Sequence, residues 1–257
     1  GSGRRSRVLA FHERLAGLGL EAIAQYGFVL AGGYALSANG IGDRPSKDVD
    51  LFTNVPDPAR FAAAFEELKV AMLRAGMVVE DMRIGPTFAD LRITESATGL
   101  SSDLQMGLDF RQFPPAQLAV GPVLDLRDAV AGKVSALWSR GEARDYIDVA
   151  AVLASGKFAR AELLAIGDQV ETVPMDRSIL AARFREADRH DSSIYADYGV
   201  DPERRAHIVA TFRDWADQVD SEASMPHETV APPPAENARR EPAGYRRGPE
   251  ANGGITW

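Results

Sequence analysis

Two aspartates with a single residue between them, Asp48 and Asp50, are the side chains of this sequence best suited to chemistry. They belong to the segment KDVDLF, whose alternating residues predict a β-strand, so both carboxylates point to one face and the apolar residues between and after them help to bury the other. Two carboxylates on one rigid strand suit a hard divalent cation such as Mg²⁺ or Mn²⁺, which also binds the phosphates of a nucleotide. The pair predicts a site for a nucleoside triphosphate (NTP) with its metal.

A glycine pair, Gly32 and Gly33, precedes this strand in the segment FVLAGGYAL. Residues 28–31 predict a short apolar strand, and residues 34–39 predict a helix that starts directly after the glycines. Because glycine has no Cβ, backbone N–H donors at such a turn can approach a phosphate closely. Taken alone, the glycine pair also fits an ordinary turn, and the aspartates also fit the solvent face of an edge strand. The order of strand, Gly-Gly turn, helix and Asp-x-Asp strand resembles the nucleotidyltransferase fold shared with DNA polymerase beta.

A third acid, Asp109, lies near the end of the segment DLQMGLDF, residues 103–110, whose alternation predicts another strand. An acid on a strand beside Asp48 and Asp50 would complete a metal site of three carboxylates. Asp109 is the candidate for this third ligand, and simple solvent exposure is the alternative that the pattern leaves open.

Two helical segments follow, 126–138 and 142–153, in which charged side chains lie among apolar residues. The ammonium group of Lys133 either extends to solvent or reaches a triphosphate or a nearby acid. Arg140 and Arg144 flank the turn between the helices, where guanidinium groups either recognise phosphate or pair with neighbouring acids. The acids available to these three cations are Glu142, Asp145 and Asp148.

In chain order, the segments FVLAGGYAL, RPSKDVDLF, GLDF and DLRDAVAGKVSALWSRGEARDYIDVAAVL resemble the AbiEii/AbiGii-type nucleotidyltransferases, which include the MenT-like group. These proteins are the toxins of bacterial toxin–antitoxin and abortive-infection systems. The resemblance covers residues 28–153, and a lysine on one helix followed by Arg-Asp-x-x-Asp on the next is its most distinctive part.

The resemblance implies a role for each matching residue. The implied catalytic residues are Asp48, Asp50, Lys133 and Asp148. The implied substrate-binding residues are Gly32, Gly33, Ser46, Arg140, Arg144 and Asp145. The implied metal ligands are Asp48, Asp50 and Asp109.

The resemblance also implies an activity: relatives add nucleotides from an NTP to the 3′ end of tRNA, which blocks aminoacylation and translation. A cognate antitoxin is the expected protein partner, and Ser46 matches a residue that an antitoxin kinase phosphorylates in some relatives. Two alternatives stay open. One is transfer of a nucleotidyl or phosphoryl group to a protein or small molecule, and the other is an inactive nucleotide-binding module with a regulatory role.

Composition limits the partners of the chain. Its 257 residues carry a formal charge of −8, so no global positive field gathers nucleic acid and any RNA contact must rest on a local patch. The absence of cysteine excludes disulfides and zinc–thiolate sites and fits a reducing cytoplasm. No apolar run approaches the roughly eighteen residues of a membrane span. One such patch is predicted from five arginines, with a mixed charged surface as the alternative because Glu186, Asp188 and Glu203 are interleaved with them: Arg183, Arg185, Arg189, Arg204 and Arg205.

These patterns predict an α+β protein of the nucleotidyltransferase (DNA polymerase beta-like) type. A mixed sheet with helices is expected over residues 4–124, a helical region that completes the active site over 125–220, and a disordered or partner-bound tail over 221–257. The sheet is expected to end before the proline-rich segment 114–122, which predicts a crossover loop. His12 is expected to be a surface or half-buried side chain, not a ligand. Further predicted elements are helices 7–26, 58–76, 160–166, 177–187 and 202–219 and strands 77–84 and 88–94.

Overall fold

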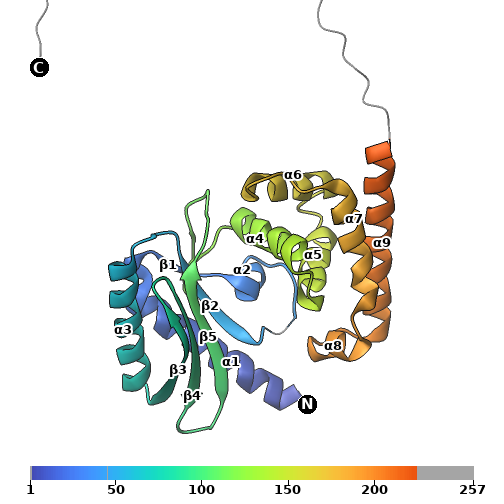
Figure 1. Ribbon diagram of the computed structural model, residues 1–257. Helices are drawn as coiled ribbons and strands as arrows, with labels where there is room; N and C mark the ends of the chain where they lie inside the picture. The colour runs from blue at the N-terminus through green and yellow to red at the C-terminus, as the bar shows by residue number, and fades with distance from the viewer. Residues whose placement is uncertain (1, 45, 225–257) are drawn as a thin grey trace, which may run out of the picture. The chain divides into compact units, whose positions relative to one another are not determined.

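The aspartate strand lies in the middle of a seven-stranded mixed sheet within residues 2–44 and 46–224, which the computed structural model describes (Figure 1). This strand, β2 (Asp48–Thr53), runs antiparallel to β1 (Phe28–Leu30) and parallel to β5 (Ser101–Leu108). The strand order is β3-β4-β5-β2-β1-β7-β6, which confirms the predicted α+β class. The remaining strands are β3 (Met77–Gly85), β4 (Phe88–Glu95), β6 (Ala116–Leu118) and β7 (Gly121–Val123).

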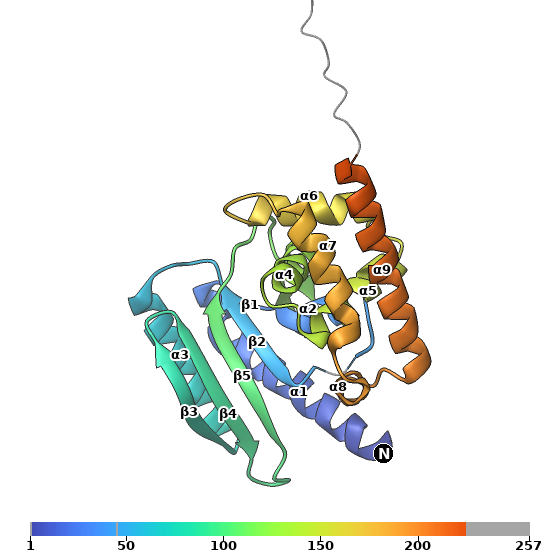
Figure 2. The same ribbon diagram turned by 45° about the vertical axis from the view of Figure 1, so that its right-hand side comes forward.

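Helices pack against this sheet and then form a region of their own, as the sequence predicts (Figures 1 and 2). The first four are α1 (Ser2–Ile23), α2 (Gly32–Ala38), α3 (Pro58–Arg74) and α4 (Leu126–Ser139). The helical region continues with α5 (Ala143–Ala154), α6 (Arg160–Val170), α7 (Arg177–Arg185), α8 (Ser192–Asp197) and α9 (Pro202–Ser224). Two short 3₁₀ turns follow α1 and α7, η1 (Ala24–Tyr26) and η2 (Glu186–Arg189).

The two faces of β2 meet different surroundings, which the alternation of its residues requires. Val49 and Leu51 are fully buried, and α1 covers them so closely that a Cβ on Gly19 would lie 2.5 Å from the Leu51 side chain. Helix α3 packs beside α1. The opposite face carries Asp48 and Asp50 and fronts the start of α2 and helix α4. Burial of one face therefore fixes the direction in which both carboxylates point.

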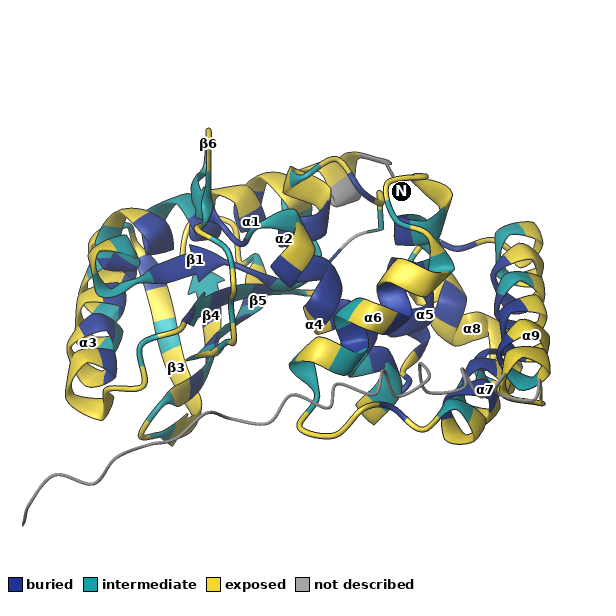
Figure 3. Cartoon of the chain, turned by 90° about the horizontal axis from the view of Figure 1, so that it is seen from above, coloured by how far each residue is buried: buried dark blue, intermediate teal, exposed yellow. Residues whose placement is uncertain are grey.

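Aromatic side chains hold the helical region together. Tyr146 of α5 meets Phe212 of α9 edge to face with ring centroids 5.0 Å apart, and Phe184 of α7 stacks on Trp215 of α9 at 4.4 Å. All four rings are buried, and Figure 3 shows burial concentrated on α4 and α5, whereas the outer side of α9 is exposed. Such aromatic pairs add to the free energy gained by burying area alone. This core fixes α5, which carries the predicted distal aspartate, and α5 packs against α4, which carries the predicted lysine.

The predicted crossover loop over 114–122 is wrong in part, because β6 and β7 lie within it and extend the sheet. Leu30 of β1 pairs with Val123 of β7 in parallel, and the N–H of Leu124 donates to the carbonyl of Leu30 at 2.9 Å. Each of these strands has only three residues. Three residues are too few to show the alternation from which a strand is predicted, and Pro122 argues locally against a strand.

The described residues form one compact unit. None of their helices has the length and apolarity that a bilayer crossing requires. The predicted tail, 221–257, falls outside the described residues from Met225 onward.

Candidate active site

A cavity of about 350 Å³ opens between the first turn of α2, the aspartate face of β2 and helix α4. It brings together acids, glycines and cations that were predicted from separate parts of the sequence. The predicted site residues that line it are Gly32, Gly33, Asp48, Asp50, Asp109, Lys133, Arg140 and Arg144. Ser46, Asp145 and Asp148 do not line it, but each contacts a residue that does.

Gly32 makes room for the Asp50 carboxylate. A Cβ on Gly32 would lie 1.7 Å from Oδ2 of Asp50, and its φ of +60° belongs to the left-handed region. Both the space and the backbone conformation therefore require glycine. At Gly33 a Cβ would meet Arg44 Nη2 at 3.1 Å and Ser46 Oγ at 3.2 Å, so this position is also crowded. The turn was predicted as a phosphate cradle, and in addition it allows an acid and a guanidinium group to approach the backbone.

The Asp48–Asp50 pair has the chemistry of a site for a divalent cation. Burial and the neighbouring charge of Asp48 raise the pKa of Asp50 to about 6, so the site favours an added positive charge. Within the described residues, no group of three or more His, Cys, Asp or Glu side chains is arranged to hold a metal. The chain thus supplies two carboxylates, and substrate phosphates would complete the coordination in the way that Mg²⁺ prefers. The donor set fits a metal that the protein and an NTP hold jointly.

Asp148 joins two buried cations. Its Oδ2 lies 3.0 Å from Nζ of Lys133 and accepts a hydrogen bond from Nη2 of Arg44 at 2.7 Å, while Arg44 Nε donates to Oδ1. Burial alone would raise the pKa of Asp148, but the charges and hydrogen bonds of Lys133 and Arg44 outweigh it and hold the pKa below its ordinary value. Asp148 therefore stays ionised, and it fixes the position of two cations that line the cavity.

Asp48 has two polar partners of its own. The hydroxyl of Ser46 donates to Oδ1 of Asp48 at 3.0 Å, and Nη1 of Arg144 lies 3.5 Å from Oδ2. Ser46 is only 5% exposed. The hydroxyl and the guanidinium group together orient the carboxylate toward the cavity.

Asp145 was predicted to bind substrate, but its contacts in the structure are with the neighbouring residues Glu142 and Arg140. It is fully buried, accepts from the N–H of Glu142 at 3.0 Å at the start of α5, and pairs with Arg140 through both carboxylate oxygens. Its capping contact stabilises the N-terminus of α5. The side chain of Arg140 is 42% exposed and lines the cavity, so Asp145 acts on the cavity through this arginine.

Asp109 lines the cavity, but its position differs from the predicted one. Strand β5 ends at Leu108, where its partner β2 also ends, so Asp109 follows the strand instead of lying on it. Arg111 pairs with both of its carboxylate oxygens, at 2.8 Å and 2.9 Å from Nη2. The residue of β5 that lies beside Asp50 in the register is Gln105. A metal contact of Asp109 stays a prediction, and it requires Arg111 to release this carboxylate.

Arg44 is the site residue that the sequence reasoning missed. Its segment, GDRPSKD, has no periodicity from which the direction of a side chain follows. The available signal was a guanidinium group four residues before an acid pair, where it suits phosphate recognition. Besides binding Asp148, Arg44 lies over the ring of Tyr198 with its Cζ 5.3 Å from the centroid. The loop before β2 is thereby attached to the end of α8.

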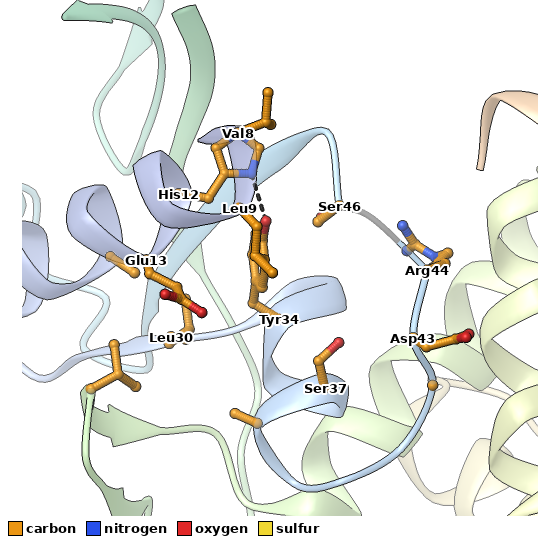
Figure 4. Close-up of a pocket in the computed structure, with 14 residues that line it drawn as sticks. Val8, Leu9, His12, Glu13, Leu30, Tyr34, Ser37, Asp43, Arg44 and Ser46 are labelled. Atoms are coloured by element: carbon orange, nitrogen blue, oxygen red, sulfur yellow. Dashed lines mark hydrogen bonds between the residues drawn. The ribbon is translucent and has the colours of Figure 1, made fainter. Parts of the chain in front are cut away.

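A second cavity, of about 660 Å³, lies between α1 and α2 (Figure 4). Nδ1 of His12 and the hydroxyl of Tyr34 are 2.5 Å apart there, and His12 is 2% exposed, so the predicted surface or half-buried position is wrong. Burial lowers the pKa of His12. The two acids of this cavity, Glu13 of α1 and Asp43 of the loop after α2, lie on different sides of it (Figure 4), whereas Asp48 and Asp50 share one strand face. The smaller cavity therefore has the better chemistry for phosphoryl transfer, although this one is larger.

The five arginines of the predicted basic patch are all paired with acids. The surface is therefore one of mixed charge, which is the alternative that the sequence left open. The acids cancel much of the positive field that would attract nucleic acid. Their partners are Glu186 for Arg183 and Arg189, Asp217 and Asp220 for Arg185, Asp43 for Arg204 and Asp188 for Arg205.

Solved structures share this fold. MenT4, a nucleotidyltransferase toxin from Mycobacterium tuberculosis, aligns with a TM-score of 0.53 at 18% identity, over 85% of this chain and 87% of that one. JHP933 from Helicobacter pylori aligns with a TM-score of 0.50 at 17% identity, over 84% of this chain and 95% of that one. The sheet with its Gly-Gly turn and Asp-x-Asp strand is thus a nucleotidyltransferase fold.

The sequence also matches a family model, the nucleotidyl transferase AbiEii toxin of type IV toxin–antitoxin systems, over residues 20–221. This range covers most of the chain and every predicted site residue. The chain belongs to the AbiEii nucleotidyltransferase toxin family and is a nucleotidyltransferase. No curated protein sequence matches it.

Proposed function

We propose that this toxin transfers nucleotides from an NTP to the 3′ end of tRNA, with Mg²⁺ or Mn²⁺, and thereby blocks aminoacylation and translation in the cytoplasm. The observation that carries the proposal is the single cavity lined by Asp48, Asp50 and Lys133 together with arginine side chains. Acids that hold metal and cations that hold phosphate are what an in-line displacement at phosphorus requires. The membership of the chain in a nucleotidyltransferase toxin family supports the same reaction.

Each side chain of the cavity has a task in this reaction. Asp48 and Asp50 hold the metal, which when bound neutralises phosphate charge and polarises the reacting oxygens. Lys133 holds a phosphate oxygen, and its contact with Asp148 sets the direction of the ammonium group before substrate arrives. Arg140 and Arg144 bind further phosphates at the cavity wall. Because few atoms have to reorganise, positioning supplies most of the catalysis.

The acceptor is expected to enter over the helical region, residues 125–220, which we propose completes the cleft begun by residues 4–124. Arg140 and Arg144 are also paired with acids, but they line the cavity, so we assign to them the phosphates that reach the cavity wall, whether of the NTP or of the acceptor. The type IV toxin–antitoxin family supports a cognate antitoxin as the protein partner.

Transfer of label from each of the four α-³²P-NTPs to total RNA, with and without Mg²⁺, tests the proposal. We expect labelled tRNA with the wild-type chain and no label with Asp48→Ala, Asp50→Ala or Lys133→Ala. Asp217→Ala, which removes an exposed acid of α9, serves as the matched control and should transfer normally.

Three results would contradict the proposal. Label in protein or small molecules, but not in RNA, would show that the acceptor is a protein or small molecule instead of tRNA. No label in any fraction would indicate an inactive binding module. Wild-type transfer by a folded Asp48→Ala protein would show that the reaction occurs elsewhere.

A further inference from the structure

The catalytic cavity has an aromatic side chain next to its acids. Phe52 follows Asp50 by two residues on the same face of β2 and lines the same cavity, so the two Cα atoms are about 6.6 Å apart along the strand. The Phe52 ring leans across the neighbouring strand, where a Cβ on Gly107 would lie 3.4 Å from its Cε1 atom. The absence of a side chain at Gly107 thus lets a half-buried aromatic ring cover the floor of the cavity.

A second aromatic residue stands at the rim. Phe110 is 67% exposed and Leu108 is 41% exposed, and both line the cavity. An aromatic side chain left this exposed beside a catalytic site marks a binding surface, because contact with a flat ligand would remove its apolar area from water. Together with Phe52, these two side chains add apolar surface to a lining that otherwise carries acids and cations, among them Asp109, which Arg111 pairs.

Gln105 lies beside the acids, one strand away. It is the β5 neighbour of Asp50 in the sheet register, it shares the aspartate face, and it lines the cavity. Its side-chain amide offers both hydrogen-bond donors and an acceptor, which the carboxylates and cations around it do not combine. An amide at this place can therefore read the edge of a planar heterocycle.

We infer that Phe52 and Phe110 form the nucleobase subsite of the cavity, where the base of the incoming NTP stacks, and that Gln105 contacts the edge of this base. The inference rests on the proposed function, which anchors the triphosphate at Asp48, Asp50 and Lys133. A ribose separates the α-phosphate from the base, and the strand distance from Asp50 to Phe52 matches that separation. Stacking accepts any base, so the choice among the four falls to Gln105.

The test compares a ligand that has a base with one that lacks it. The equilibrium affinities of the full chain with Mg²⁺ are measured for the four α,β-imido NTP analogues and for inorganic triphosphate. Phe110→Ala and Phe52→Leu should each lower the affinity for the analogues by about 5- to 150-fold, the range for loss of one stacked base. Neither substitution should change the affinity for inorganic triphosphate. Phe110→Trp should retain wild-type affinity. Gln105→Ala should bring the four analogue affinities closer together.

Leu73→Ala is the matched control, because Leu73 is 57% exposed on α3, away from the cavity, and its truncation should change neither affinity. The subsite would be overturned if the phenylalanine variants lost as much affinity for inorganic triphosphate as for the analogues. It would also be overturned if their affinity for the analogues did not change. Weaker binding of tRNA with unchanged analogue affinity would also overturn it and would place an acceptor base there instead.

The outcomes separate this inference from the proposed function. The phenylalanine variants can lose affinity for the analogues but not for inorganic triphosphate while no RNA is labelled in the transfer assay. In that case the subsite stands and the tRNA acceptor is wrong. If the wild-type chain binds neither the analogues nor inorganic triphosphate, both proposals are overturned.

Discussion

The ammonium nitrogen of Lys133 lies 3.0 Å from Oδ2 of Asp148, and both residues are less than 10% exposed. This ion pair joins α4 to α5 and accounts physically for the lysine and distal aspartate of the sequence motif. Lys133 lines the cavity that we propose is catalytic, whereas Asp148 does not line it and also holds Arg44. The acid is thus a positioning residue for two cations on different elements.

Replacement of Asp148 by asparagine should destabilise the fold as well as reduce activity. Asp148→Asn removes the carboxylate charge that pairs with Lys133 and Arg44, and breaking a buried pair in this way lowers the free energy of unfolding by about 3 kcal/mol. Urea denaturation measures the loss. Asp217→Asn, at an exposed ion pair, should change stability by less than about 0.5 kcal/mol. A wild-type denaturation midpoint for Asp148→Asn would show that the pair contributes nothing to stability.

The same residue predicts a dependence of stability on pH. Because the folded state holds the pKa of Asp148 below its ordinary value of 3.8, the ionised acid stabilises the fold above that value. The stabilisation is lost as the pH falls through the folded-state pKa. The difference in unfolding free energy between wild type and Asp148→Asn should therefore be full at pH 7 and shrink below pH 3.8. Denaturation curves over this range measure it, and a constant difference would exclude the ionisation of Asp148 as its source.

The sequence predicted the strands and helices whose positions follow from alternation, helical spacing or a capping residue. The alternation in β2 gave both the strand and the side that its acids occupy, because one face had to be apolar to be buried. Asp57 followed by Pro58 gave the start of α3, where the Asp57 carboxylate accepts from two backbone N–H groups. The apolar spacing of 126–138 and 142–153 placed Lys133 and the distal acids on two consecutive helices.

The parts that the sequence did not predict depend on contacts between distant segments. Arg44 and Asp148 are 104 residues apart, and only the docking of the helical region on the sheet brings them together. The end of β5 is set by the end of its partner β2, so a pattern that continued through Asp109 predicted two residues too many. His12 is buried because Tyr34 of another helix covers it.

Alanine at Gly32 should abolish transfer. The added Cβ would lie 1.7 Å from the Asp50 carboxylate and would also strain a backbone with φ of +60°. We expect a loss of at least about 2 kcal/mol of stability and more than about 100-fold of activity, because the metal-binding acid must move. Gly40→Ala is the control: its φ is +78° but its Cβ would meet open space, so only the backbone strain, about 1 kcal/mol, remains. Equal effects of both substitutions on transfer would show that the Asp50 contact is irrelevant.

A negative charge at Ser46 should inhibit transfer. Its hydroxyl donates to Oδ1 of Asp48, so Ser46→Glu replaces a hydrogen bond with charge repulsion at a metal-binding acid. Ser46→Ala removes only one hydrogen bond and should retain transfer within about tenfold. Initial rates at several Mg²⁺ concentrations measure both, and a wild-type rate for Ser46→Glu would count against control at this residue.

Asparagine at Asp50 should stabilise the protein in metal-free buffer while it abolishes transfer. The folded state raises the pKa of Asp50 from 3.8 to about 6, so at pH 7.5 its ionised carboxylate is less stable in the fold than in the unfolded chain. Asp50→Asn removes this effect and should raise the free energy of unfolding by about 3 kcal/mol. Asp103→Asn, at a surface ion pair on the neighbouring strand, is the control and should change little. Mg²⁺ should raise the melting temperature of wild type but not of Asp50→Asn, because only wild type keeps both carboxylates. A metal-free Asp50→Asn protein less stable than wild type would contradict the assignment of Asp50 as an acid held in place for a cation.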